Sequence, residues 1–156
     1  MGRVEAIYIG EKSGTSLASV ASVDARRGRG LLGDRHCLPD DPSPSEHRPE
    51  RELTLIESET FEAIERDLGL SVEPADARRN VLTSGVPLNH LVGIEFTVGE
   101  VRVRGLELCE PCGHLRKLTS NEFRRALVHR GGLRAAILSD GTIHVGDPVR
   151  IPASEK

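Results

Sequence analysis

The stretch IEFTVGEVRVRGLEL, residues 94–108, indicates the fold class because apolar and polar side chains alternate on both sides of Gly99. An alternation of period two is typical of a strand with one buried face. A glycine between two such runs is typical of a tight turn that joins antiparallel strands. We therefore expect a hairpin with strands over 94–98 and 101–108.

Short runs of the same kind occur along most of the chain, and Gly or Pro interrupts them. Asp140-Gly141 lies between two of these runs and predicts a second hairpin, formed by 133–138 and 142–145. Together with the first hairpin, the expected strands are 4–9, 53–57, 80–82, 133–138, 142–145 and 149–151.

Two other segments have the period of a helix. Ser58 is a suitable N-cap and Gly69 a suitable end, and Phe61, Ile64 and Leu68 fall on one face between them. A weaker pattern covers about 121–129. About seven to eight short strands with two or more peripheral helices predict a mixed α/β, strand-rich fold built on a small β-barrel.

The length of 156 residues suits a single domain, which we place at 1–156. Within it, residues 37–51 (CLPDDPSPSEHRPER) form a Pro-rich loop with four prolines and almost no apolar residue. Long loops of this kind are either functional lids or disordered segments, and the sequence does not separate the two.

Composition excludes several classes of protein. No apolar run approaches the roughly 18 residues of a membrane helix, and no signal-peptide pattern is visible, so we expect a cytoplasmic protein without a membrane partner. A net charge of −3, with one Tyr, three Phe and no Trp, argues against nucleic-acid binding. The charge is uneven, however: residues 78–134 carry 10 basic and 5 acidic side chains, which leaves room for a local anion site.

Two clusters contain arginines that suit anion binding. The stretch 28–37 (GRGLLGDRHC) matches G-x-G-x-x-G only formally, because it neither follows a convincing strand nor opens a helix. It is either a tight turn held by Asp34 or a turn that directs Arg35 and His36 into a pocket. In Arg78-Arg79-Asn80, neighbouring side chains on a strand point to opposite faces, so only one arginine can serve a given pocket. The alternative is a surface salt-bridge residue beside a structural one.

Three cysteines, an odd number, favour thiol chemistry or a metal over a disulfide framework. Cys109 and Cys112 form a C-x-x-C pair, which supplies half of a zinc site. The residues available to complete such a site are Cys37, His36, His47 and His114. Without a metal, the pair is a reversible disulfide, one reactive thiol beside an inert one, or two inert thiols.

Taken in order, these features resemble the MOSC domain, named for the C-terminal domain of molybdenum-cofactor sulfurases. The similarity covers roughly residues 1–151, and no single piece of it is specific. The matching elements are Gly33–His36, Arg51–Ile56, Arg78–Val81, Gly93–Gly99, Pro111-Cys112, Gly131–Leu133 and Gly146-Asp147.

The resemblance implies a strand-rich β-barrel that binds a molybdopterin-type molybdenum cofactor. The family's cysteine matches Cys112, whose thiolate would ligate molybdenum or carry a persulfide sulfur. The family's Arg-Pro-Asn segment falls on Arg78 and Asn80, which would hydrogen-bond the pterin or its phosphate, with Arg79 in place of the proline.

Four further residues complete the expected cofactor site. Arg35 and His36 would contact the cofactor from the Gly-rich turn. Ser58 and Thr60 lie at the start of the first helix, where free backbone amides suit a phosphate.

The implied activity is sulfur transfer or molybdenum-dependent reduction of N-hydroxylated compounds, with a sulfur donor or an electron-transfer protein as partner. Pyridoxal phosphate is not expected, because no lysine lies in a motif suited to a Schiff base. Whether the chain is an enzyme is left open by its sequence. The alternatives are a carrier that delivers cofactor or sulfur without turnover, and a zinc protein that uses Cys109 and Cys112 with a histidine.

Overall fold

The central hairpin of this computed structural model forms as predicted: β7 (Glu95–Val98) and β8 (Val101–Leu108) pair antiparallel around Gly99. Phe96, Val98, Val101 and Val103 are buried, while the side chains between them face outward. The structure describes residues 2–11, 17–69, 71–109 and 131–152. The remaining strands are β1 (Gly2–Ile9), β2 (Ala18–Val20), β3 (Ser22–Arg26), β4 (Gly30–Leu31), β5 (Leu53–Glu57), β6 (Val81–Ser84), β9 (Leu133–Ile137), β10 (Gly141–His144) and β11 (Pro148–Arg150).

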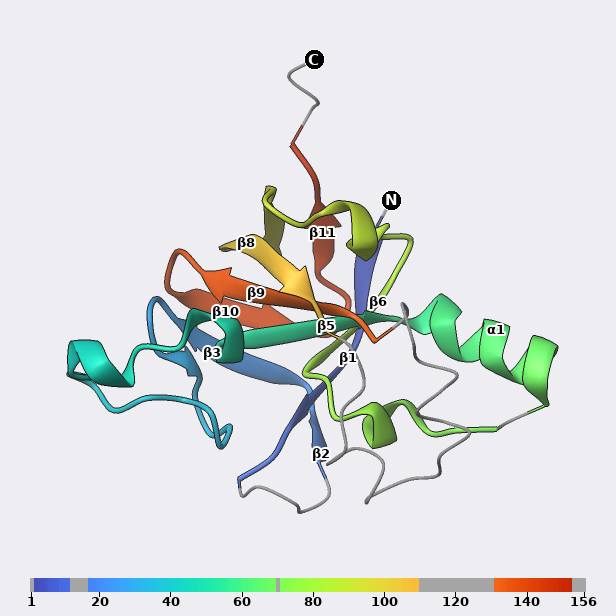
Figure 1. Ribbon diagram of the computed structural model, residues 1–156, viewed down its shortest axis with the longest axis horizontal. Helices are drawn as coiled ribbons and strands as arrows, with labels where there is room; N and C mark the ends of the chain where they lie inside the picture. Colours follow the sequence, from blue (N-terminus) through green and yellow to red (C-terminus); the bar gives the residue numbers. More distant parts are fainter. Residues whose placement is uncertain (1, 12–16, 70, 110–130, 153–156) are drawn as a thin grey trace.

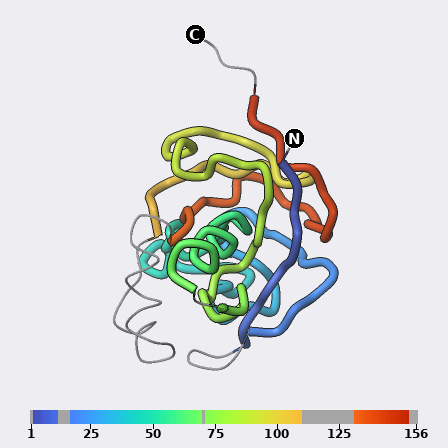
Figure 2. The backbone as a smooth tube through the Cα atoms, turned by 90° about the vertical axis from the view of Figure 1, so that its right-hand side faces the viewer, coloured from blue at the N-terminus to red at the C-terminus, as the bar shows by residue number. Residues whose placement is uncertain are grey.

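Seven of these strands close into a barrel, as the strand count predicts (Figure 1). The hydrogen-bonded order is β11-β7-β8-β9-β5-β6-β1, with β2 added beside β1. Closure comes from β11, because Val149 pairs with Gly2 of β1 on one side and Val98 of β7 on the other. The apolar faces of both sheets enclose one buried cluster, in which Val4, Leu55 and Leu133 are fully buried. The tube in Figure 2 shows the chain winding around this closed core.

The predicted hairpin around Asp140-Gly141 is wrong. The strands β9 and β10 do not pair with each other: β9 lies between β5 and β8, whereas β10 pairs with β3 in a second sheet of order β10-β3-β4. The turn itself exists, and the Asp140 carboxylate accepts the backbone N–H of Arg27 at 2.7 Å. An Asp-Gly pair thus marks a change of direction, but packing in the core selects the partner strand.

The sequence also missed β2, β3 and β4, which are two to five residues long. Such short runs carry little alternation, and only their pairing with distant strands makes them regular. Because β3 precedes the Gly-rich stretch, that stretch does follow a strand. It leads into β4 rather than a helix, so the dinucleotide-binding interpretation still fails.

The predicted first helix is α1 (Ser58–Leu68), which packs on β5 and β6. Its N-cap is Glu57, one residue before the predicted Ser58, and Gly69 ends it in the left-handed conformation at φ 69°. Ile64 is fully buried, whereas Leu68 is 56% exposed and does not join the buried face as expected. The predicted helix over 121–129 lies outside the described residues.

The Pro-rich loop contains two short 3-10 helices, η1 (Pro44–Glu46) and η2 (Pro49–Arg51). The buried Glu52 carboxylate follows it and accepts the backbone N–H of Ile137 at 2.7 Å. The second carboxylate oxygen of Glu52 lies 3.3 Å from His47 Nε2. These contacts fix both the end and the middle of the loop against β9. Further along the chain are η3 (Pro74–Ala77) and η4 (Leu88–His90). No helix in the described part of the chain is long and apolar enough to cross a membrane.

Candidate functional site

A rigid turn presents Arg35 and His36. The Asp34 carboxylate, 8% exposed, accepts the backbone N–H of Gly10 at 3.0 Å and of His36 at 3.3 Å. The Arg35 N–H donates back to the Gly10 carbonyl at 2.6 Å. Gly30 and Gly33 have φ of 122° and 91°, which non-glycine residues rarely adopt. The turn is therefore tight and held by Asp34, and Arg35 and His36 project from it.

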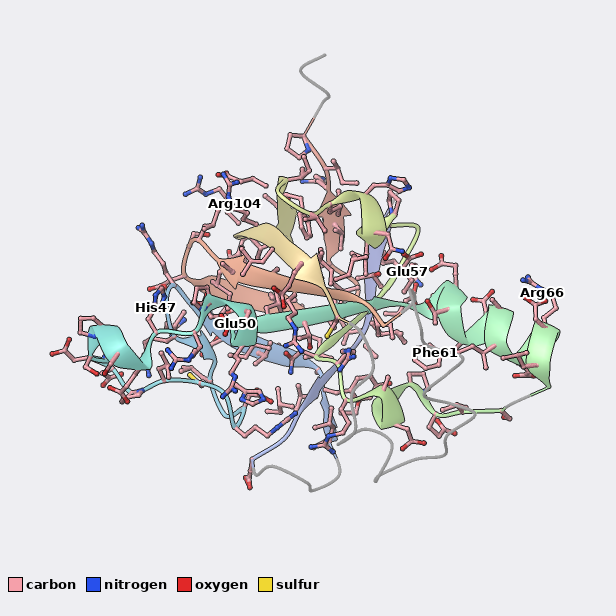
Figure 3. All side chains as sticks on the ribbon, viewed as in Figure 1. His47, Glu50, Glu57, Phe61, Arg66 and Arg104 are labelled. Carbon is pink, nitrogen blue, oxygen red and sulfur yellow. The ribbon has the colours of Figure 1, made fainter. Side chains whose placement is uncertain are left out.

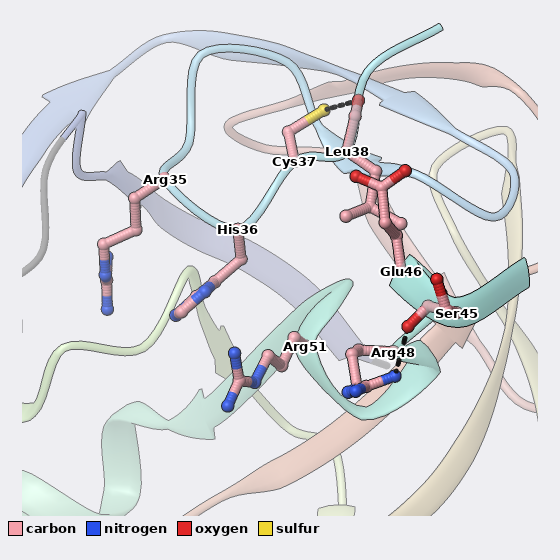
Figure 4. Close-up of a pocket in the computed structure, with 8 residues that line it drawn as sticks. All are labelled: Arg35, His36, Cys37, Leu38, Ser45, Glu46, Arg48 and Arg51. Carbon is pink, nitrogen blue, oxygen red and sulfur yellow. Dashed lines mark hydrogen bonds between the residues drawn. The ribbon is translucent and has the colours of Figure 1, made fainter. Parts of the chain in front are cut away.

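These side chains line a cavity of about 300 Å³ between the turn and the η1–η2 loop (Figure 4). One wall comes from the turn, and the other from Arg48 and Arg51 of the loop. The lining residues are Arg35, His36, Cys37, Leu38, Ser45, Glu46, Arg48 and Arg51. In Figure 4, the His36 ring extends from the turn and the Arg51 guanidinium from the loop, both toward the same side of the view.

The charge around this cavity is mainly positive. Burial lowers the pKa of His36, and the nearby Arg35 lowers it further, with smaller effects of Arg51 and Arg134 and an opposing one of Asp34. Burial also lowers the pKa of Arg78, and Arg35 adds to this effect. Arg35 thus belongs electrostatically both to the cavity and to the neighbourhood of Arg78.

The sequence suggested that Arg78 lies on a strand, but the structure places it at the end of η3. It ends η3 in the left-handed conformation, with φ 61°, and β6 begins three residues later at Val81. Its Nε and Nη2 atoms are buried. A non-glycine residue held at positive φ is uncommon and marks a place where the surroundings dictate the backbone.

The neighbouring Arg79 reaches in a different direction, toward the ends of the segment that carries Cys112. Its Nε donates to the Gly131 carbonyl at 2.7 Å, and its Nη2 donates to the Cys109 carbonyl at 3.5 Å. The Cys109 N–H in turn donates to the Gly132 carbonyl at 2.7 Å. Sequence reasoning gave Arg79 no such role, because only the fold brings residues 109 and 131 together.

Asn80 is 6% exposed and connects three strands. Its Oδ1 accepts the Thr54 N–H and the Thr54 hydroxyl, both at 3.1 Å, and its Nδ2 donates to the Tyr8 carbonyl at 3.1 Å. The side chain therefore holds β1 and β5 against the start of β6. One Nδ2 hydrogen of Asn80 is not used in these bonds, and the predicted contact with a pterin would use that hydrogen.

Ser58 and Thr60 do not join the cavity. They lie at the far end of β5 from Arg51, about 17 Å away for a strand of five residues. Figure 3 shows this separation, with Glu57 and Phe61 beside α1 and His47 and Glu50 at the other end of β5. Two carboxylates already serve this region: Glu59 accepts the Gly85 N–H at 2.8 Å and Glu57 accepts the Leu88 N–H at 3.2 Å. Such negative charge disfavours a phosphate there.

Two of the three cysteines, Cys37 and Cys109, lie among the described residues. Cys112, the predicted ligand, and His114 lie outside the described residues. Cys109 is buried at 1% exposure, and Cys37 lies on the cavity wall, where burial raises the pKa of its thiol. Among the described residues, no three His, Cys, Asp or Glu side chains lie close enough together to hold a metal ion.

Comparisons with known proteins agree with this architecture. A family model of the MOSC domain matches residues 42–150. The YuaD protein from Bacillus subtilis has a similar structure, with a TM-score of 0.77, 19% identity, and coverage of 96% of this chain and 94% of its own. YiiM from Geobacillus stearothermophilus has a TM-score of 0.74 and 16% identity, and the similarity covers 97% of this chain and 75% of that one.

YiiM from Escherichia coli is similar at a TM-score of 0.68 and 19% identity, over 97% of this chain and 70% of its own. At such low identities these likenesses show a shared fold and nothing finer. A search of the curated proteins finds no match to this chain.

Proposed function

Because the chain belongs to the MOSC domain family, we propose that it binds a molybdopterin-type molybdenum cofactor and uses Cys112 as the ligand of the metal or the carrier of a sulfur atom. The single observation that supports this proposal most is the pairing of two neighbouring arginines. Arg78 lies in the electrostatic neighbourhood of Arg35 and Asp34, while Arg79 anchors both ends of the segment that contains Cys112.

The described residues fit the anionic end of such a cofactor. Arg35 and Arg78 bring positive charge to one region and His36 adds a ring N–H donor, and part of the Arg78 guanidinium is buried there. Guanidinium groups bind phosphate oxygens in a forked geometry, and burial strengthens the interaction. When bound, the cofactor would supply a metal centre for the two-electron reduction of an N-hydroxylated compound, or a site for a sulfur atom.

The chain's own residues would then bind the cofactor and orient it. Arg35, His36 and Arg78 would neutralise and position the phosphate, and Asn80 would hold the strands on which Arg78 and Arg79 depend. Cys109 serves this arrangement through its backbone, since its N–H and its carbonyl both anchor the segment. We assign the functional thiol to Cys112 and a structural role to Cys109.

Turnover requires a second protein in this proposal. If the chain is a reductase, it would receive electrons from an electron-transfer protein. If it transfers sulfur, it would receive the sulfur atom from a separate donor. A chain that binds the cofactor but reduces no N-hydroxylated compound with any electron donor would instead be a carrier.

The test is the metal and pterin content of the chain purified from a host that makes the cofactor. We expect molybdenum and molybdopterin in the natural chain, and loss of the metal in Cys112→Ala. Cys109→Ala is the matched control, because it removes a thiol three residues away and leaves the backbone contacts of residue 109 in place; it should keep the metal. Stoichiometric zinc without molybdenum would contradict the proposal and favour a zinc site on the same cysteine pair.

A further inference from the structure

The cavity beside His36 has more positive charge than its own residues neutralise. Arg35, Arg48 and Arg51 line it, and Glu46 is the carboxylate among the described lining residues. The Glu46 carboxylate is held within its own loop, because its Oε1 accepts the Ser43 N–H at 2.9 Å and the Ser43 hydroxyl at 3.1 Å. A group of cations around one hollow is costly without an anion, since like charges raise each other's energy.

The arginines keep donors for a ligand. In the described part of the chain, no hydrogen bond or ion pair joins the Arg51 side chain to another residue, although Arg51 lines the cavity. Arg48 uses Nη1 to hold the Ser45 and His47 carbonyls, both at 3.0 Å, which fixes the loop that carries it. Arg35 forms an ion pair with the Asp34 carboxylate at 3.7 Å, a separation longer than a hydrogen bond.

Both walls of the cavity are built before any ligand arrives. The turn is held by the bonds of Asp34 to Gly10 and His36. The loop is held by the bond of Glu52 to Ile137 and by the contact of Glu52 with His47. A site whose charged groups are already in place loses less conformational entropy on binding than a flexible one.

We propose that this cavity binds the phosphate monoester group of a small molecule, with Arg51, Arg48 and Arg35 as its cationic contacts. A phosphate monoester carries close to two negative charges at neutral pH and three acceptor oxygens, which matches several guanidinium groups better than a single carboxylate does. A volume of about 300 Å³ holds a phosphate with a small group attached. No Phe, Tyr or Trp is among the described lining residues, so stacking of a nucleic-acid base has no platform here.

His36 provides a reporter for this site. Burial lowers its pKa in the ligand-free chain, and the arginines around it lower the pKa further. A bound dianion would offset their field, so the pKa of His36 should rise when the cavity is filled. Asp34 opposes the arginines and is the buried acid beside this ring.

The experiment titrates ribose 5-phosphate into the cofactor-free chain at pH 7.5 and low salt, by calorimetry and by NMR of the His36 ring, with ribose as the uncharged control. We expect saturable binding of the phosphate, no binding of ribose, and a raised His36 pKa. Arg51→Gln should weaken the affinity at least about tenfold, the loss expected for one charge-assisted contact. Arg66→Gln, which removes the same charge from the exposed far end of α1, should change it less than twofold.

The outcomes separate this site from the proposed cofactor function. Absence of binding to the folded, cofactor-free chain, or equal weakening by Arg51→Gln and Arg66→Gln, would overturn the site whether or not the chain binds molybdenum cofactor. A second titration uses the cofactor-loaded chain. Loss of ribose 5-phosphate binding there identifies the phosphate as the cofactor's own, and retained binding assigns it to a second ligand such as a phosphorylated substrate. If the chain never takes up the cofactor, the titration of the cofactor-free chain still tests the phosphate site.

Discussion

At the scale of single residues, Asn80 shows how a motif residue can serve the fold and the site together. Asn80 is buried, and its side chain has three hydrogen bonds, to the Thr54 N–H, the Thr54 hydroxyl and the Tyr8 carbonyl. A cofactor-binding role alone would not require these bonds. The structural role therefore predicts a stability effect that is measurable without any ligand.

We expect Asn80→Ala to lower the free energy of unfolding by about 1–3 kcal/mol, because it leaves half-buried donors and acceptors of Thr54 and Tyr8 without their Asn80 partner. Denaturant unfolding of the cofactor-free chain measures this. Glu65→Ala, on the exposed side of α1, is the control and should stay within about 0.5 kcal/mol. An equally small effect at Asn80 would show that its amide bonds are not structural.

His36 makes stability depend on pH in a defined direction. Burial and the arginines lower its pKa in the folded chain below the usual value of about 6.5. As the pH falls below that value, the unfolded chain takes up a proton that the folded chain resists, so the free energy of unfolding decreases.

In His36→Gln this contribution is absent, and the difference from the natural chain should change between pH 7.5 and pH 5. We expect the variant to lose less stability over that interval. Unfolding curves at several pH values measure this difference. Burial raises the pKa of Glu52, but Glu52 is present in both proteins, so its contribution cancels in the difference. Parallel pH profiles for the two proteins would mean that the His36 pKa is not lowered.

At the scale of elements, the junction of β8 and β9 determines where the segment with Cys112 begins and ends. Cys109 follows β8 and Gly132 precedes β9, and they are joined by a backbone hydrogen bond. Gly132 has φ 103°, and a Cβ there would collide with the carbonyl of Leu55. The junction therefore requires glycine at this position, and Arg79, just before β6, reinforces it through its bonds to the Gly131 and Cys109 carbonyls.

We expect Arg79→Met to raise the rate of amide exchange at Cys109 about tenfold, because two carbonyls lose their donor. Arg79→Lys, which keeps the charge and one donor, should restore part of the protection. Arg104→Met is the control, since Arg104 also bonds a carbonyl, that of Gly93, but at the exposed surface. Equal exchange at Cys109 in Arg79→Met and the natural chain would remove Arg79 from this role.

At the scale of the whole molecule, closure of the barrel depends on the last strand. β11 is three residues long, yet it pairs with both β1 and β7 and places Val149 in the core. Without it, β7 and the first residues of β1 would become open edges with unpaired backbone groups.

A chain that ends at Asp147 is therefore expected to lose cooperative unfolding or to melt roughly 10 °C or more lower than the natural chain. A chain that ends at Pro152 keeps β11 and should melt as the natural chain does. Thermal unfolding followed by circular dichroism compares the two. Similar melting of both truncated chains would show that closure contributes little.

Alternation and capping residues were sufficient to predict the strands β1, β5, β7 and β8, the helix α1 with its end at Gly69, and a strand-rich barrel. These features depend on neighbours within a few residues, which the sequence displays directly. The same local information identified Arg35, His36 and Arg78 as candidates for anion binding, but not Arg48 and Arg51, because a Pro-rich loop shows no period that places its side chains.

The sequence by itself determined the longer strands of the barrel and the helix α1, and it singled out Arg35, His36 and Arg78 as candidate anion-binding residues. Only the tertiary structure decided that β10 pairs with β3, that β11 closes the barrel, and that Arg79 links residues 109 and 131. The physical reason is that strand partners and carbonyl anchors are chosen by packing and hydrogen bonding between residues far apart in the chain. Thr142 and Asp24, joined by a hydrogen bond of 2.8 Å, are an example that no local pattern reveals.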